Sequence, residues 1–169
     1  MRSPALRSMT LQLLAIVAAG CSVGRIESGV YHSPKGYHVS LPSPGWSVKR
    51  GGAADLELQR ATPPGGMLVD ATCEDKAVRR PLDVLTRHLT FGLKERVVEE
   101  SGPLTVGGRP AQRAVLRGSL DGTPVEVEAI VVKGDQCVYD FLYVAPPEAF
   151  ASGREAFRAF VESVNGSVR

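Results

Sequence analysis

The most constraining feature of the chain is an alternation of apolar and charged residues between two turn signals. Asp121-Gly122 favours a tight hairpin, and Gly134-Asp135 marks a second reversal of the chain. Between the turns, every second residue of 125–131 is valine or alanine, and two glutamates stand among them. A period of two is typical of a half-buried strand. The sequence therefore predicts a three-stranded antiparallel meander over 111–119, 125–131 and 137–144.

The first half of the chain repeats this period in shorter pieces. Tyr37, Val39 and Leu41 alternate with polar residues, and proline and glycine clusters separate further candidate strands. These candidate strands cover 46–48, 56–58, 67–73 and a stretch from 97 onward. Met67, Val69, Ala71 and Cys73 share one face of their strand, which predicts that Cys73 points inward.

Two segments change to a helical period. Leu82, Leu85, Leu89 and Leu93 form one stripe behind Pro81, which is tolerated in a first helical turn. Near the C-terminus, Phe157, Phe160, Val161 and Val164 form a second stripe, and Ser152 to Glu155 match a capping box. Antiparallel strands interrupted by one helix and closed by another predict an α+β fold with helices covering sheet faces.

The N-terminal segment has the pattern of an export signal. Arg2 and Arg7 precede a short apolar run that ends in small residues before Cys21. The run is too short to cross a bilayer, which takes about 20 residues. Ala18 to Cys21 resemble the lipobox of bacterial lipoproteins, although that pattern prefers leucine where Ala18 stands. The resemblance implies cleavage after residue 20 and acylation of Cys21; the alternative is an ordinary secretory signal with an incidental cysteine.

This interpretation divides the chain into a signal peptide at 1–20, a lipidated tether at 21–29 and a single globular domain at 30–169. Ser22 follows the expected lipid site, and lipoproteins without aspartate there usually move to the outer membrane. We therefore expect a lipid-anchored protein of the bacterial envelope that faces the periplasm, with the membrane as a partner through its lipid. No cofactor and no metal is expected.

Charge does not indicate nucleic-acid binding. The full chain has 20 Lys and Arg against 18 Asp and Glu. Cleavage after residue 20 removes Arg2 and Arg7, so basic and acidic side chains then balance. A nucleic-acid surface needs basic residues clustered on one face, whereas pairs such as Arg79-Arg80 are typical of solvated positions.

Cys73 and Cys137 remain if Cys21 carries lipid. An even pair in an exported chain favours a disulfide, because the periplasm is oxidising. The alternative is two buried free thiols that pack as small apolar groups. If the turn at 134–135 has two residues, Val132 lies opposite Cys137, and Cys137 has to meet Cys73 on another neighbouring strand or across a sheet edge.

Three stretches resemble the PsbP-like superfamily: residues 33–42 followed by Trp46, the G-x-P-A stretch at 108–111, and the C-terminal segment from Tyr139 to Val164. That superfamily includes the extrinsic PsbP subunit of photosystem II, a eukaryotic Ran-binding nuclear import factor and many bacterial lipoproteins. The resemblance implies an α/β/α sandwich around a central, mostly antiparallel sheet. It carries over no functional residue, because the superfamily has no common catalytic constellation.

Candidate catalytic and metal-binding residues are few. His32 and His38 bracket a turn and could approach each other, but a metal site needs further converging ligands. Cys73 with His88 could act as nucleophile and base only if no disulfide forms. Glu99 and Glu100 are expected to point to opposite faces of a strand, which is wrong for an acid and base pair.

Three functions remain open. The leading expectation is a non-catalytic, lipid-anchored accessory or adaptor that binds a protein partner in the envelope. The second is a periplasmic small-molecule or ion binding protein with a pocket between helix and sheet, near Trp46 and the face of Tyr139 to Tyr143; the alternative for those aromatics is plain core. The third is a hydrolase with a dispersed site that uses His88 or Asp140.

Overall fold

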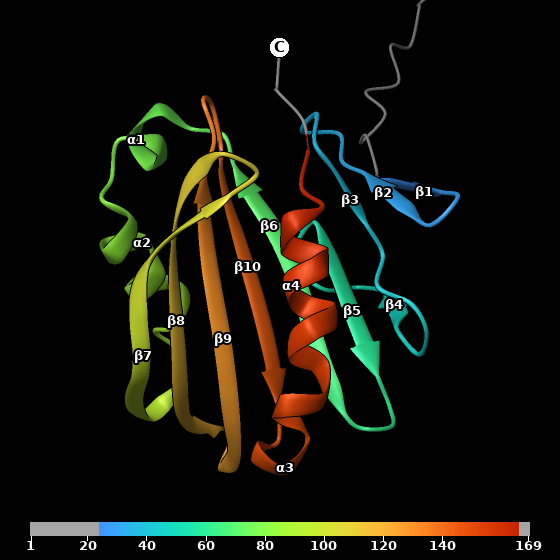
Figure 1. Cartoon of the computed structure of the whole chain (residues 1–169), viewed down its shortest axis with the longest axis vertical. Coiled ribbons are helices and arrows are strands. Elements are labelled where there is room, and N and C mark those ends of the chain that lie inside the picture. The colour runs from blue at the N-terminus through green and yellow to red at the C-terminus, as the bar shows by residue number, and fades with distance from the viewer. Residues whose placement is uncertain (1–23, 166–169) are drawn as a thin grey trace, which may run out of the picture.

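The computed structural model of the chain describes residues 24–165. Figure 1 shows a twisted sheet with helices on both of its faces. The expected signal segment 1–20 and the expected lipid site Cys21 lie outside the described residues. Within them, no helix is long and apolar enough to span a bilayer.

The central sheet has seven antiparallel strands in the order β4-β5-β6-β10-β9-β8-β7. The predicted meander forms the largest part of this sheet, and β7, which precedes it in the chain, pairs with its first strand. β6 pairs with β10, the last strand of the meander, although the whole of β7, β8 and β9 lies between them in sequence. The strand bounds are β4 Ser47–Lys49, β5 Leu56–Arg60, β6 Gly65–Thr72, β7 Lys94–Val106, β8 Arg109–Leu120, β9 Thr123–Lys133 and β10 Val138–Ala145.

A second sheet of three short strands lies beside β5 and α4 (Figure 1). It consists of β1 Arg25–Glu27, β2 Val30–His32 and β3 His38–Ser40. The β1 pairing brings part of the expected tether 21–29 into folded structure, because Arg25 pairs with His32. The chain end also joins this sheet, since His38 and Asn165 exchange two backbone hydrogen bonds.

Helices cover the two faces of the central sheet in different places. On one face, α4 (Arg154–Glu162) packs its Phe157, Phe160 and Val161 into the main core with Tyr139 and Phe141. On the other face, Leu93, just after α2 (Leu82–Leu89), packs with Leu116 and Val127. Short helices α1 (Asp75–Val78) and α3 (Pro147–Phe150) lie at the ends of strands. The fold is thus the expected α+β sandwich of the PsbP-like type.

Two helix boundaries differ from the sequence prediction. The leucine stripe at 82–93 predicts one helix, but α2 ends at Leu89 and Thr90 is its C-cap residue. The capping box is wrong, because the residue before α4 is Gly153 and Ser152 bonds instead to Ala149 and Arg60. A 3-10 turn occupies Ala151–Gly153, where a Cβ on Gly153 would collide with the Tyr143 ring and hydroxyl. That close approach fixes glycine at the start of α4.

The two cysteines form a disulfide at one end of the central sheet. Thr72 of β6 pairs with Val138 of β10, so Cys73 and Cys137 are the next facing pair, with Cα atoms 4.0 Å apart. The turn before β10 is shifted by one residue from the expected 134–135, since the Gly134 amide donates to the Cys137 carbonyl and Val132 pairs with Tyr139 instead of Cys137. Cys137 is buried as its strand predicts, but Cys73 is exposed. The sulfur of Cys73 is directed toward the core, since it bonds to the buried Cys137, but the residue itself is exposed and follows the end of β6 at Thr72.

Candidate functional site

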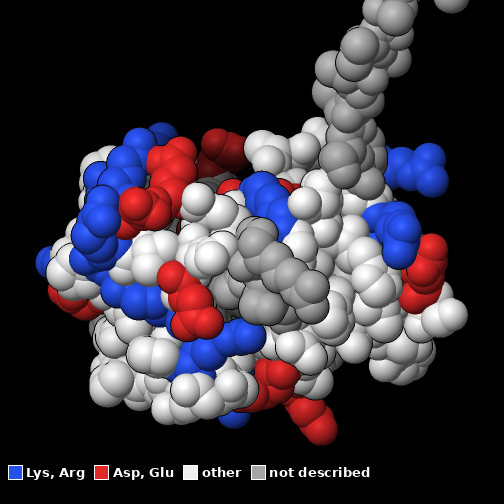
Figure 2. All heavy atoms as spheres, turned by 90° about the horizontal axis from the view of Figure 1, so that it is seen from above, with Lys and Arg blue, Asp and Glu red and all other residues white. Residues whose placement is uncertain are grey.

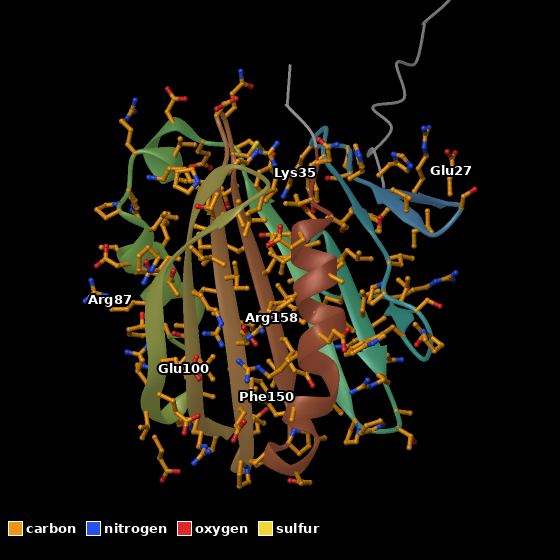
Figure 3. The ribbon with its side chains drawn as sticks, in the orientation of Figure 1. Glu27, Lys35, Arg87, Glu100, Phe150 and Arg158 are labelled. Atoms are coloured by element: carbon orange, nitrogen blue, oxygen red, sulfur yellow. A yellow bond between two sulfur atoms is a disulfide. The ribbon has the colours of Figure 1, made fainter. Side chains whose placement is uncertain are left out.

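Charged side chains form alternating rows on the sheet face that also carries α4. The rows are acidic on β7, basic on β8, acidic on β9 and basic on α4, and each row bonds to the next. We call this set the charge ladder; its members are Glu99, Glu100, Arg113, Arg117, Glu126, Glu128, Arg154 and Arg158. Figure 3 shows two of them, Glu100 and Arg158, on the same side of the sheet between β7 and α4.

Glu128 is the centre of the ladder and has no exposed surface. Its Oε1 accepts a hydrogen bond from Arg113 Nε, and its Oε2 accepts one from Arg154 Nε at 3.1 Å. Arg158 Nε lies 3.7 Å from Oε1. A buried carboxylate is tolerated only when it is paired and hydrogen-bonded, and three arginines from two elements meet that requirement.

Arg113 connects Glu128 to the edge of the ladder. Its Nη1 donates to Glu100 Oε2 at 2.7 Å, while its Nη2 is buried and has no hydrogen-bond partner among the described residues. Burial alone would lower the pKa of the Arg113 guanidinium, but the bonds to Glu128 and Glu100 outweigh it and raise that pKa. The bond from Arg113 also lowers the pKa of Glu100. Both groups therefore stay charged at neutral pH.

The outer part of the ladder contradicts the predicted orientation of Glu99 and Glu100. Glu99 contacts Arg117 and Glu100 contacts Arg113, and these two arginines share one face of β8. The expected opposite orientation of Glu99 and Glu100 is wrong because the pairing of β7 with β8 shifts register between Val98 and Glu100. A bulge of this kind interrupts the alternation of side chains.

A pocket of about 270 Å³ opens beside the ladder, between α4 and the last part of β7. Its floor is apolar and contains Leu104, Val106, Ile130 and Val161. Arg113, Arg158 and the exposed Glu162 complete its wall. The pocket thus has an apolar floor and charged side chains at its wall.

A second charged cluster lies at the other side of the sheet, where the 33–36 turn meets β6. Lys35 Nζ lies 2.7 Å from Asp55 Oδ1 and 3.2 Å from Asp70 Oδ1. Asp55 also accepts hydrogen bonds from the Tyr37 hydroxyl and the Ala71 amide. These contacts join the small sheet to the central sheet, which gives the cluster a structural role.

Asp140 belongs to the same region but forms no ion pair with a Lys or Arg among residues 24–165. It pairs directly with Asp70 across β10 and β6, and its Oδ1 is buried with no hydrogen-bond partner among the described residues. Burial, and then the charge of Asp70, raise the pKa of Asp140 to about 6. Asp140 thus differs from Glu128, whose charge is compensated.

The other residues that the sequence singled out are placed as follows. His32 and His38 pair across β2 and β3 with ring centroids 5.8 Å apart, but no third ligand-type side chain joins them within residues 24–165. His88 is exposed on α2, and Cys73 is held in the disulfide and so has no thiol to pair with it.

The expected pocket near Trp46 is filled by side chains. Trp46 packs against Tyr143 with ring centroids 6.3 Å apart, and Arg60 lies 4.8 Å above the indole. Tyr139 and Tyr143 are buried in the main core. The interpretation of these aromatics as core is confirmed, and the helix-to-sheet pocket lies farther along α4.

Exposed apolar side chains gather at one corner of the molecule. Phe91 is 83% exposed in the segment before β7, and Val97 and Val98 are 60% and 53% exposed on β7. Leu120 lies near Lys94, because its neighbour Ser119 pairs with Lys94, and Val97 and Val98 point to opposite faces of the edge strand β7, so that this group wraps around the sheet edge. We call Phe91, Val97, Val98 and Leu120 the apolar corner; among the residues 24–165, the other exposed large apolar side chains are Ile26 and Val48.

The basic side chains have acidic neighbours on the end of the molecule that Figure 2 shows. Lys and Arg gather at the left of that view, on the side where α1 lies, with Asp and Glu directly beside them. In α1 itself, Lys76 lies 2.8 Å from Glu74, and Arg79 lies 3.8 Å from Asp75. These positions are solvated ion pairs.

Sequence reasoning missed both the charge ladder and the apolar corner. Glu126 and Glu128 stood out only as the polar half of a strand pattern, and nothing in the spacing of the arginines shows that α4 returns to cover them. The signal available for the corner was Val97-Val98 beside Phe91, where the alternation of a half-buried strand fails.

Comparison with known proteins gives structural neighbours and no sequence family. No family model matches the chain, and no characterised protein matches it significantly in sequence. Among solved structures, the cyanobacterial PsbP protein CyanoP from Synechocystis is similar with a TM-score of 0.58 and 11% identity, over 89% of this chain and 96% of that one.

Two further neighbours come from bacteria. LpqN of Mycobacterium tuberculosis, a protein involved in cell envelope biogenesis, aligns with a TM-score of 0.56 and 16% identity over 78% of this chain and 84% of that one. A protein of unknown function from Pseudomonas aeruginosa aligns with a TM-score of 0.53 and 10% identity over 75% and 84%. At these identities the similarity establishes the fold alone, which is PsbP-like.

Proposed function

We propose that this chain is a lipid-anchored accessory protein of the bacterial envelope whose domain binds a protein partner. The export signal ending at Cys21 supports the anchor, and the structural similarity to LpqN is compatible with an envelope role. The domain acts as an adaptor and performs no chemistry of its own.

The observation that carries the proposal is the apolar corner. Large apolar side chains that are exposed singly are ordinary, but a group of them at one place marks an interaction surface. Here Phe91, Val97 and Val98 lie within eight positions of sequence around the edge strand β7, and the β7–β8 pairing places Leu120 near the start of that strand. A partner that covers this corner would remove them from water.

The geometry of β7 indicates how the partner binds. This strand is at the edge of the sheet, but its pairing with β8 is shifted twice between Lys94 and Glu100, and Pro103 follows. Bulges and prolines are devices that keep an edge strand from pairing with another chain. We therefore assign the contact to side chains of the corner and not to addition of a partner strand.

The test is cross-linking and co-purification of the full-length protein from its own envelope. A Phe91→Ser, Val98→Ser variant should recover at least tenfold less of the partner than the wild type. Ile26→Ser is the matched control, because Ile26 is also exposed but lies on β1, and it should leave recovery unchanged. Cys21→Ala tests the anchor separately.

The outcomes separate the two parts of the proposal. Loss of the partner with the corner variant, at unchanged protein level, supports the binding surface. Equal recovery with wild type and corner variant contradicts it. If Cys21→Ala releases the protein from membranes, the anchor is supported; membrane association that survives this change contradicts lipidation at Cys21.

A further inference from the structure

A hollow of about 620 Å³ opens between the small sheet and the β4 edge of the central sheet. Ile26 of β1 and Val48 of β4 both line it, together with Gly24, the first residue that the structure describes. Ile26 is 44% exposed and Val48 is 38% exposed. Within residues 24–165, the two exposed large apolar side chains outside the apolar corner therefore share one hollow beside Gly24.

The distance from Gly24 to the expected lipid site is short. Three residue steps separate Cys21 from Gly24, and an extended chain covers at most about 3.6 Å per residue, which gives about 11 Å. Acyl chains on Cys21 would insert into the bilayer and hold that cysteine at its surface. Gly24 and the hollow beside it then stay close to the bilayer. Figure 1 shows β1 and β4 on one side of the molecule and β7 on the other.

The exposed charges on this side are basic. Segment 47–54 forms β4 and the loop after it, and it contains Lys49 and Arg50 but no acidic residue. Arg50 is exposed and belongs to no ion pair in the described part of the chain. Gly51 and Gly52 follow and are exposed as well, so little side-chain volume keeps this loop away from a flat surface. Lipid phosphates could approach Arg50 closely.

The carboxylates of the hollow are turned toward the protein. Glu57 accepts a hydrogen bond from the Ala53 amide and lies 3.2 Å from Lys49 Nζ, and its side chain is 17% exposed. Asp55 lies 2.7 Å from Lys35 Nζ and is 13% exposed. Opposite charges are therefore close to balanced in the hollow, and net charge does not draw it to a membrane. The withdrawn carboxylates also do not repel lipid phosphates strongly.

We infer that this side of the domain lies on the membrane surface, with Ile26 and Val48 against the lipids and Arg50 at their phosphates. The inference rests on the lipid anchor of the proposed function and adds that the domain itself touches the bilayer. Apolar side chains at a bilayer surface reach about 5–10 Å into the boundary between headgroups and acyl chains. Two such side chains bind weakly alone, but an anchor that already holds them at the surface raises their effective concentration.

This contact directs the partner surface away from the bilayer. β4 and β7 are the two edges of the central sheet. The six strand spacings between them, at about 4.8 Å each, separate the edges by about 29 Å. The apolar corner around β7 is thus held toward the periplasm, where a partner can reach it.

The test measures lipid contact at each edge of the sheet. The lipidated protein is purified from its own envelope and reconstituted into vesicles of phosphatidylethanolamine and phosphatidylglycerol that contain a nitroxide-labelled lipid. A fluorophore on Ala53→Cys reports the hollow, and one on Val98→Cys reports the opposite edge; both positions are exposed. The nitroxide should quench the first about threefold more strongly than the second, because the two edges lie about 29 Å apart.

Two variants separate contact from mere proximity. Ile26→Asp with Val48→Asp places charges where apolar side chains meet the lipids, so quenching at position 53 should fall to the level at position 98. Phe91→Asp with Val97→Asp is the matched control, because it makes the same change at the opposite edge and should leave quenching at 53 unchanged. Arg50→Gln, which alters one exposed side chain, should lower quenching at 53 by a smaller amount in a fully folded protein.

Each outcome bears on the contact or on the anchor. Quenching at 53 that is lost with the two aspartates supports the contact. Quenching that survives both the aspartates and Arg50→Gln would show that the short tether alone brings this side near the bilayer, which overturns the inference. Flotation with vesicles but equal quenching at 53 and 98 overturns it while the anchor stands. A protein that does not float with vesicles contradicts the anchor and the inference together.

Discussion

Two carboxylates on neighbouring strands are buried in opposite ways. Glu128 on β9 is fully buried and touches three arginines, whereas Asp140 on β10 faces Asp70 and forms no ion pair with a Lys or Arg among residues 24–165. The charge of Glu128 is compensated by its neighbours. The charge of Asp140 is not, and the pKa of Asp140 rises to about 6 as a result of burial and the charge of Asp70.

The difference lies in the elements that cover each residue. Alternation places Glu128 on the face that receives α4, whose first and second turns carry Arg154 and Arg158. Asp140 lies on the opposite face, where the nearby Lys35 pairs with Asp55 and Asp70. A carboxylate is therefore compensated by cations on one face of the sheet and faces a second carboxylate on the other.

Removal of Glu128 should have the largest effect. Glu128→Ala leaves three arginines without their common anion and opens a void, so we expect a loss of about 3–5 kcal/mol in the free energy of unfolding. Chemical denaturation at pH 7 measures it. Glu126→Ala is the matched control, since Glu126 contacts only Arg117. Losses of equal size in both variants would show that Glu128 is not the centre of the ladder.

The disulfide should rank second. It joins the strands that hold Asp70 and Asp140 opposite each other, and the two cysteines are 64 positions apart in sequence. A Cys73→Ser, Cys137→Ser variant should lose about 2–4 kcal/mol, because the unfolded chain regains the freedom that the crosslink removes. Reduction of the wild type should lower its melting temperature to that of the variant. A wild type whose melting does not respond to reductant would contradict a structural disulfide.

Asp140→Asn should stabilise the protein, in contrast to Glu128→Ala. The folded pKa of about 6 lies above the unfolded value near 4, so the wild type loses stability as pH rises between these values and keeps that loss at higher pH. We expect the variant to gain about 1–3 kcal/mol at pH 8 and little at pH 4. Urea unfolding at both pH values measures it.

The control for this prediction is Asp121→Asn in the exposed β8–β9 turn, where asparagine also accepts the positive φ of 50°. Its unfolding free energy should follow the wild type across the pH range. A gain in Asp140→Asn that is the same at pH 4 and pH 8 would show that charge is not the cause.

The alternation of apolar and polar residues along the strands could be predicted, because it is a local pattern that consecutive residues show. Val125, Val127 and Val131 face a covered side of the sheet as the alternation indicates. The same alternation predicts that Glu128 faces water, and this is wrong because α4 covers the other side as well. The arginines that compensate Glu128 come from positions 113, 154 and 158, and the sequence carries no local signal that they meet.

Register effects explain the remaining differences. The disulfide was predictable from compartment and cysteine count, but the exposure of Cys73 depends on where β6 leaves the covered sheet. The orientation of Glu99 and Glu100 depends on one bulge in β7. The apolar corner depends on the pairing of Lys94 with Ser119, which places Leu120 near the start of β7. Each of these is set by tertiary pairing and not by local pattern.

The outer end of the charge ladder should contribute least, and this sharpens the contrast between exposed and buried pairs. Arg117 lies 2.9 Å from both Glu99 and Glu126, but its side chain is 61% exposed. Arg117→Gln should therefore cost no more than about 1 kcal/mol, and the cost should shrink in 0.5 M salt because solvent ions screen exposed charges. Arg113→Gln, which removes the main donor to Glu128, should cost several times more and change little with salt. Denaturation of both variants at low and high salt measures the difference. Equal costs for the two variants would mean that burial does not set the strength of the ladder, since of these two arginines it is Arg113 that contacts the fully buried Glu128.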